Sequence, residues 1–142
     1  MKVKEDKSGM KSVDGEFTAT FYDKSGNKSG DFKADRISGV MDGDIFNVNA
    51  YDKDNLIKFQ IPRDFGIKKH ELTDKGEFLF MSDPADAERW YAQSGYVDIE
   101  NNDVADYRGS FHVKKRSEGD TDKSAMEGRY RLDVSAIKKA AK

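Results

Sequence analysis

The chain of 142 residues contains no cysteine, only two prolines and only two histidines. The lack of cysteine excludes disulfides, thiolate catalysis and cysteine-ligated zinc. No apolar run approaches the roughly 18 residues of a membrane-spanning helix, so we predict no membrane insertion. The net charge of −2 argues against a nucleic-acid-binding protein, because such proteins present a strongly basic surface.

The triplet Asp64-Phe65-Gly66 matches the magnesium-binding motif of protein kinases. A kinase also needs a Gly-rich phosphate loop, a paired lysine and glutamate, and a His-Arg-Asp loop, and this chain has none of them. We interpret the triplet as a turn after a strand that Pro62 ends, because proline cannot donate to a β-ladder. Phe65 and Ile67 are then expected to pack onto the core.

Metal-binding and catalytic signatures are also missing. His70 lacks the second histidine of a helical zinc motif, and His112 is predicted to point outward from a strand. The acidic loops that begin at Asp23 and Asp52 lack the glycine and the glutamate of an EF-hand. We interpret these acidic residues as turn carboxylates exposed to solvent. The alternative is a weak calcium site assembled from several loops. Since nucleotide-binding and hydrolase motifs are absent as well, we predict no cofactor and no enzymatic activity.

What the chain does contain is a repeated alternation of apolar and polar residues. Nine phenylalanines, six tyrosines and one tryptophan supply material for a core. The period of two is typical of strands with one buried face. The alternation predicts one shared core made of Phe17, Phe21, Phe46, Val48, Phe59, Ile61, Val97, Ile99, Phe111, Val113, Tyr130 and Leu132.

Several short strands separated by turn residues indicate a mainly β protein, either a single antiparallel β-barrel or a sandwich of lipocalin-like appearance. We predict a flexible polar leader over residues 1–13 and a single β-rich domain over residues 14–142. A short internal helix is expected over residues 83–93, with proline at its first position. A short C-terminal helix is expected over residues 135–142, with a serine cap.

Arg89, Trp90, Tyr91 and Tyr96 are the predicted ligand- or partner-binding residues. Large aromatic side chains beside an arginine are what binding hot spots favour. The segment also lies where the strand pattern breaks, and loops carried on a rigid sheet are common functional positions. The alternative for Trp90 is an anchor in the core. A further alternative is that one ring lines the mouth of a site for an apolar or sugar ligand.

Three strand-like segments carry a family resemblance. Their shared positions are Ser94, Gly95, Val97 and Ile99, then Gly109, Phe111 and Val113, then Glu127, Gly128, Arg129 and Tyr130. Over residues 37–134 the chain resembles small β-domain proteins of unknown function from bacterial envelopes, many of them lipoproteins. The resemblance implies a lipocalin-like or sandwich-like fold and no activity. The lipobox cysteine of such lipoproteins is absent.

These features predict a non-enzymatic binding or interaction protein of bacterial type, which contacts a protein partner through a sheet surface, an edge strand or loops. An inhibitor or immunity protein fits the same features. The alternative is a carrier of a small apolar ligand, which needs a barrel cavity of roughly 300 Å³ or more. The expected location is the cell envelope or periplasm if the natural gene encodes a signal peptide before Met1, and the cytoplasm otherwise.

Overall fold

The computed structural model describes residues 10–73, 75–116 and 121–137, which form twelve strands. Six of them make sheet A: β1 (Lys11–Ser12), β4 (Arg36–Asp42), β5 (Ile45–Asp52), β6 (Asn55–Pro62), β8 (Leu79–Asp83) and β9 (Trp90–Tyr91). The other six make sheet B: β2 (Asp14–Tyr22), β3 (Lys28–Lys33), β7 (Lys69–Leu72), β10 (Ser94–Asp103), β11 (Asp106–Lys114) and β12 (Ala125–Asp133).

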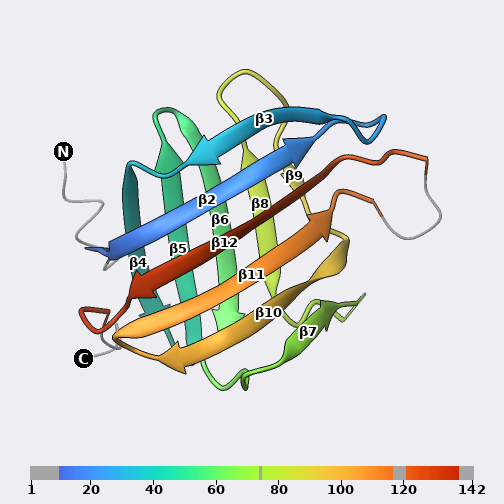
Figure 1. The fold of residues 1–142 in the computed structure, drawn as a ribbon. Coiled ribbons are helices and arrows are strands. Elements are labelled where there is room, and N and C mark those ends of the chain that lie inside the picture. The colour runs from blue at the N-terminus through green and yellow to red at the C-terminus, as the bar shows by residue number, and fades with distance from the viewer. Residues whose placement is uncertain (1–9, 74, 117–120, 138–142) are drawn as a thin grey trace.

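The two antiparallel sheets lie one in front of the other, and their strands cross obliquely (Figure 1). Sheet A has the strand order β1-β4-β5-β6-β8-β9, and sheet B has the order β3-β2-β12-β11-β10-β7. The first long strand, β2, therefore pairs with the last strand, β12. The prediction of a sandwich is confirmed, whereas the alternative of a closed barrel is wrong, because the strands form two separate ladders.

Stacked aromatic rings fill the space between the sheets. Phe111 of sheet B stacks on Phe17 at 5.5 Å and on Phe80 of sheet A at 4.6 Å between ring centroids. Phe59 continues the stack to Tyr130 at 5.3 Å. Eleven of the twelve predicted core residues are buried in one cluster, and the twelfth, Phe21, packs partly buried against it. The alternation in the sequence thus predicted the buried face of these strands.

Two turns that follow strands of sheet A test the sequence predictions for residues 52–67, and they confirm some of these predictions and contradict one. β5 and β6 are joined by a tight hairpin in which Lys53 has a positive φ of 57°. β6 ends at Pro62 as predicted, and Phe65 packs against the core. Ile67, however, is 59% exposed, so its predicted burial is wrong. The Ile99 amide donates to the Lys68 carbonyl and holds the loop backbone against β10, and residue 67 then faces solvent.

The predicted helix over residues 83–93 does not form, and this prediction is wrong. β8 continues to Asp83, a turn follows, and Trp90 then pairs with Ser82 as part of β9. The Asn55 side chain accepts a hydrogen bond from the Ala85 amide and fixes the turn. Pairing of β9 with the preceding strand β8 overrides the local helix signal of the proline.

The chain ends differ from the sequence prediction in detail. Lys11 and Ser12 pair with β4, and Val13 is buried, so part of the predicted leader belongs to the sandwich. Residues 1–9 lie outside the described residues. Ser135 lies in a turn, with its amide bonded to the Asp133 carboxylate, and most of the predicted C-terminal helix, residues 138–142, also lies outside the description. Across the described part of the chain, no helix is long and apolar enough to cross a membrane.

Candidate functional site

The outer face of sheet B carries polar side chains in registered rows. Alternation forces this arrangement, because each buried residue of β2, β10, β11 and β12 is flanked by residues that point to the opposite side. The first row runs across five strands and consists of Tyr96, His112, Glu127, Thr20 and Asp31, each opposite the next. The second row lies two residues further along the strands and consists of Asp98, Ser110, Arg129, Thr18 and Lys33.

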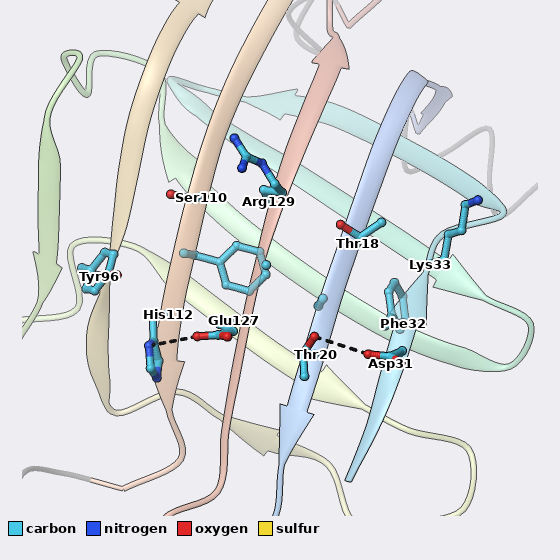
Figure 2. A pocket seen from close by; sticks show the side chains of 13 residues that line it. Thr18, Thr20, Asp31, Phe32, Lys33, Tyr96, Ser110, His112, Glu127 and Arg129 are labelled. Carbon is cyan, nitrogen blue, oxygen red and sulfur yellow. Dashed lines mark hydrogen bonds and ion pairs between the residues drawn. The ribbon is translucent and has the colours of Figure 1, made fainter. Parts of the chain in front are cut away.

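These two rows are called the polar face below. All of their residues except Asp98 line a shallow open groove of about 560 Å³ on the outside of sheet B. Figure 2 shows the side chains of β10, β11, β12, β2 and β3 arranged across it. The groove crosses five strands, which is about 19 Å at the usual strand spacing.

Hydrogen bonds and a close histidine–carboxylate contact hold the centre of the first row. His112 Nδ1 lies 3.4 Å from Glu127 Oε1, and the Tyr22 hydroxyl donates to Glu127 Oε2 at 2.7 Å (Figure 2 shows the first pair). The hydrogen bond to Glu127 raises the pKa of Tyr22, so the phenol stays protonated and keeps donating. Thr20 donates weakly to Asp31 at 3.4 Å. The Glu127 carboxylate is therefore oriented from two sides.

The second row is looser and carries the positive charges. Arg129 lies 3.5 Å from Glu100, but its side chain is 68% exposed. Ser110 and Thr18 lie on either side of it in the row. Among the described side chains that line the groove, Asp31 and Glu127 balance Lys33 and Arg129, so its formal charge is zero with neutral histidine. The groove therefore offers hydrogen-bond donors and acceptors with no net formal charge.

One ring lies at the end of the first row. Tyr96 is half-buried on β10, and the Lys69 ammonium sits 4.4 Å from its ring centroid. The His112 ring is 6.2 Å away and tilted. The cation over the ring fixes its position, which makes it a rigid apolar surface beside the polar side chains.

The four predicted site residues do not form one site. Arg89 is exposed just before β9, and Trp90 packs partly buried against the core, which agrees with its alternative role as an anchor. Tyr91 is 48% exposed on sheet A, whereas Tyr96 lies on sheet B. The chain changes sheets between them at residues 92–93, where the Gln93 amide already bonds to β11. Only Tyr96 belongs to the polar face.

Tyr91 lines a second hollow of about 520 Å³. This end groove is lined by Ile45, Gln60, Pro62, Leu72, Thr73, Gly76, Glu77, Phe78, Leu79, Tyr91, Ala92 and Gln93. Its lining combines apolar side chains with four polar ones, Gln60, Thr73, Glu77 and Gln93, of which only Glu77 is charged. That composition is typical of small-molecule sites, and it contrasts with the charged surface on sheet B.

The polar face lacks the geometry of known hydrolytic sites. Ser110 and His112 share one face of β11, yet in the described part of the chain no hydrogen bond joins them, as a nucleophile and its base require. The backbone amides around them pair with β10 and β12, so they cannot form an oxyanion hole. Within residues 10–73, 75–116 and 121–137, no group of three histidine and acidic side chains is placed to hold a metal.

The sequence predicted His112 on an outward face but did not mark it as a site residue, and Arg129 appeared among the positions of the family resemblance. Nothing local marks Glu127 as a neighbour of Thr20 and Asp31, because β12 is far in the chain from the consecutive strands β2 and β3. The prediction favoured β9 because of its two aromatic residues. The polar face is recognised only when the outward-pointing residues of neighbouring strands are aligned by the pairing of those strands.

The family resemblance of residues 37–134 stays a prediction. Comparisons with protein-family models, with curated proteins and with solved structures found no significant match to this chain.

Proposed function

We propose that the protein is a non-enzymatic binding protein and that it holds a hydroxyl-rich, uncharged ligand, an oligosaccharide, on the polar face. The observation that carries the proposal is the pair of registered rows over five strands, which places donors and acceptors side by side along an open groove.

The donor and acceptor inventory matches sugar hydroxyls. Arg129 and Lys33 only donate, ionised Glu127 and Asp31 only accept, and Ser110 does both. A sugar hydroxyl also donates and accepts, so neighbouring hydroxyls of one ring can bond to a carboxylate in one row and a guanidinium in the other. Tyr96 adds an apolar surface for the C–H face of a ring.

Charge balance distinguishes this ligand from a polyanion. Two acidic and two basic side chains line the groove, so a nucleic acid gains no net electrostatic attraction there. The groove is shallow and open, which suits a chain of sugar units that extends beyond it. A protein partner on the same face is the alternative, and it fits the mixed charges as well.

The other modes of action expected from the sequence have less support. Stacked rings such as Phe59 and Phe111 occupy the space between the sheets, which disfavours a carrier with an internal ligand. The edge strands β1 and β9 have two residues each, and the edge strands β3 and β7 carry lysines and acidic residues. Short or charged edges resist the addition of a partner strand.

The test is a panel of neutral oligosaccharides screened as an array, followed by titration calorimetry and amide-resolved NMR on the sugars that bind. We expect the shifted amides to lie on β10, β11, β12, β2 and β3. Arg129→Ala and Glu127→Gln should each weaken binding by about tenfold, the usual effect of losing a charge-assisted hydrogen bond. Arg63→Ala, which removes the same charge from the turn after β6, should leave affinity unchanged.

The outcomes separate the face from the ligand class. If no sugar binds but a protein does, and Arg129→Ala abolishes that complex, the face is right and the ligand class is wrong. If a sugar binds and the shifted amides lie away from sheet B, the assignment of the face is wrong.

A further inference from the structure

The end groove has a different chemistry from the polar face. Its apolar walls come from Ile45, Pro62 and Leu79, with Leu72 and Phe78 buried beneath them. Leaving such groups in contact with water costs free energy in proportion to their apolar area. An apolar body that fills the groove recovers this free energy.

A fixed carboxylate lies among these walls. The Thr73 hydroxyl lies 2.9 and 2.8 Å from Glu77 Oε1 and Oε2, and the Thr73 amide also donates to Oε1 at 3.3 Å. Hydrogen bonds from the Glu77 backbone and from Thr73 lower the pKa of Glu77, with a contribution from the Lys75 charge, so it is ionised at neutral pH. The side chain therefore presents a negative charge in one orientation.

A second acceptor faces the same hollow. The Gln60 Nε2 atom donates a hydrogen bond to Asn47 Oδ1 at 2.6 Å. The Asn47 side chain donates in turn to the Ile45 carbonyl. This chain of bonds fixes the Gln60 amide and leaves its Oε1 oxygen as an acceptor. Gln60 and Glu77 both line the groove.

Among the described residues, the lining contains one carboxylate and no lysine, arginine or histidine. Lys75 is the cation that acts on Glu77, and it lies outside the lining, on the same turn. At the rim, Tyr91 and Ile45 are 48% and 38% exposed. A tyrosine ring with a free face attracts cations as well as apolar groups.

We propose that the end groove binds a small amphipathic amine, a molecule with a protonated primary amino group on an apolar chain or ring. The apolar body packs on the walls formed by Ile45, Pro62 and Leu79. The ammonium donates to Glu77 and Gln60, and Tyr91 closes over its edge. This site is independent of the polar face, because it lies on other strands and requires a positive charge in its ligand.

The experiment titrates the intact protein with two matched probes, protonated 2-phenylethylamine and uncharged 2-phenylethanol, and follows amide-resolved NMR shifts. The amine should shift residues 60–61, 72–73, 76–79 and 91–93. The alcohol should bind about tenfold more weakly, because it carries no positive charge to pair with the Glu77 carboxylate. Raising the salt concentration should weaken the amine and leave the alcohol unchanged.

Two variants test whether the preference for a charged ligand depends on the Glu77 carboxylate. Glu77→Gln should reduce the affinity for the amine about tenfold and abolish the difference between the two probes. Glu71→Gln, which neutralises an exposed carboxylate on β7, is the matched control and should have no effect. Since Glu77→Gln can disturb its turn, the comparison of the two probes on the unmodified protein stands alone as a test. Equal affinities for amine and alcohol, no binding of either, or shifts that map to the polar face would overturn the proposal.

Discussion

Glu127 on β12 lies directly opposite His112 on β11, and its two oxygens are engaged from different sides, by the imidazole at 3.4 Å and by the Tyr22 hydroxyl at 2.7 Å. The carboxylate is thus held in place before any ligand arrives. A side chain that is already ordered loses less conformational entropy on binding, which favours affinity. The relationship makes Tyr22 a positioning residue of the polar face.

Replacing Tyr22 by phenylalanine tests this role. The variant removes one hydrogen bond to Glu127 on a part-buried surface, so the free energy of unfolding should fall by about 0.5–1.5 kcal/mol. Affinity for a bound oligosaccharide, measured by calorimetry, should fall several-fold. Tyr51→Phe, on sheet A, is the control and should keep full affinity. A Tyr22→Phe protein with unchanged affinity would show that the orientation of Glu127 does not matter.

Gly128 is a packing requirement where β12 pairs with β2. A Cβ at this position would collide with the Thr18 carbonyl oxygen and would lie 2.8 Å from the Ala19 Cα. Gly128→Ala should therefore lower the free energy of unfolding by about 1–3 kcal/mol, as other overpacked positions do. Gly30→Ala on edge strand β3, where a Cβ meets nothing within 4 Å, is the matched variant. Denaturant titration should find Gly30→Ala close to the natural protein, and equal losses in both variants would contradict the account.

Phe111 joins the two sheets through its stacking partners. Its side chain is buried between Phe17 and Phe80, so Phe111→Ala should cost about 3–5 kcal/mol through lost burial and the cavity left behind. Ile67→Ala removes an exposed apolar side chain and should change stability by less than about 0.5 kcal/mol. Urea unfolding of both variants measures the difference. A loss below about 1 kcal/mol for Phe111→Ala would mean that the ring is not packed as described.

Phe111, His112 and Glu127 show which features of the structure can be predicted from the sequence. Phe111 and His112 differ in their position in the alternation, so one was assigned to the core and the other to the surface from pattern alone. That Glu127 lies between His112 and Thr20 depends on the pairing of β2 with β12, which joins opposite ends of the chain. Alternation gives the face of a residue, whereas the strand order depends on long-range packing that no local pattern records.

Tyr91 and Tyr96 show the same limit. They are five residues apart, and the prediction grouped them because both are large and near a break in the strand pattern. The break is a crossing from sheet A to sheet B, which separates their side chains onto different surfaces. The strand β9 was missed for a different reason, because its two residues are too few to show an alternating pattern.

Trp90 is expected to contribute to stability and not to binding on the polar face. The ring packs partly buried against the core, so Trp90→Ala should lower the free energy of unfolding by about 1–3 kcal/mol, less than for a fully buried aromatic. Affinity for an oligosaccharide on sheet B should not change. If Trp90→Ala reduced the affinity and left the melting temperature unaltered, residues 89–96 would contribute to the binding site as the sequence predicted.

Alkaline pH should destabilise the fold through two buried phenols. Burial raises the pKa of Tyr107 to about 12, against an opposing effect of the neighbouring Tyr130 hydroxyl, and burial also raises the pKa of Tyr130. The folded state therefore holds these protons more tightly than the unfolded state, in which tyrosine has its ordinary pKa of 10.0. The resulting stability is complete below pH 10 and is lost as the pH rises toward 12.

Tyr107→Phe tests this pH dependence. The Tyr107 hydroxyl is buried without a hydrogen-bond partner of good geometry, so its removal should cost little at about pH 8. The urea midpoint of the variant should then fall less than that of the natural protein between pH 10 and pH 12. Identical pH profiles would show that Tyr107 does not titrate with the fold.

The central claim is that the polar face of sheet B is the binding surface, and amide-resolved NMR titration with an array-selected neutral oligosaccharide measures it most directly. The account predicts that shifted amides cluster around Glu127 and Arg129 on β12 and their neighbours on β11 and β2. It also predicts that Arg129→Ala weakens the titrated affinity about tenfold, whereas Arg63→Ala leaves it unchanged. Shifts that lie on sheet A, or an affinity that stays unchanged in Arg129→Ala, would contradict it.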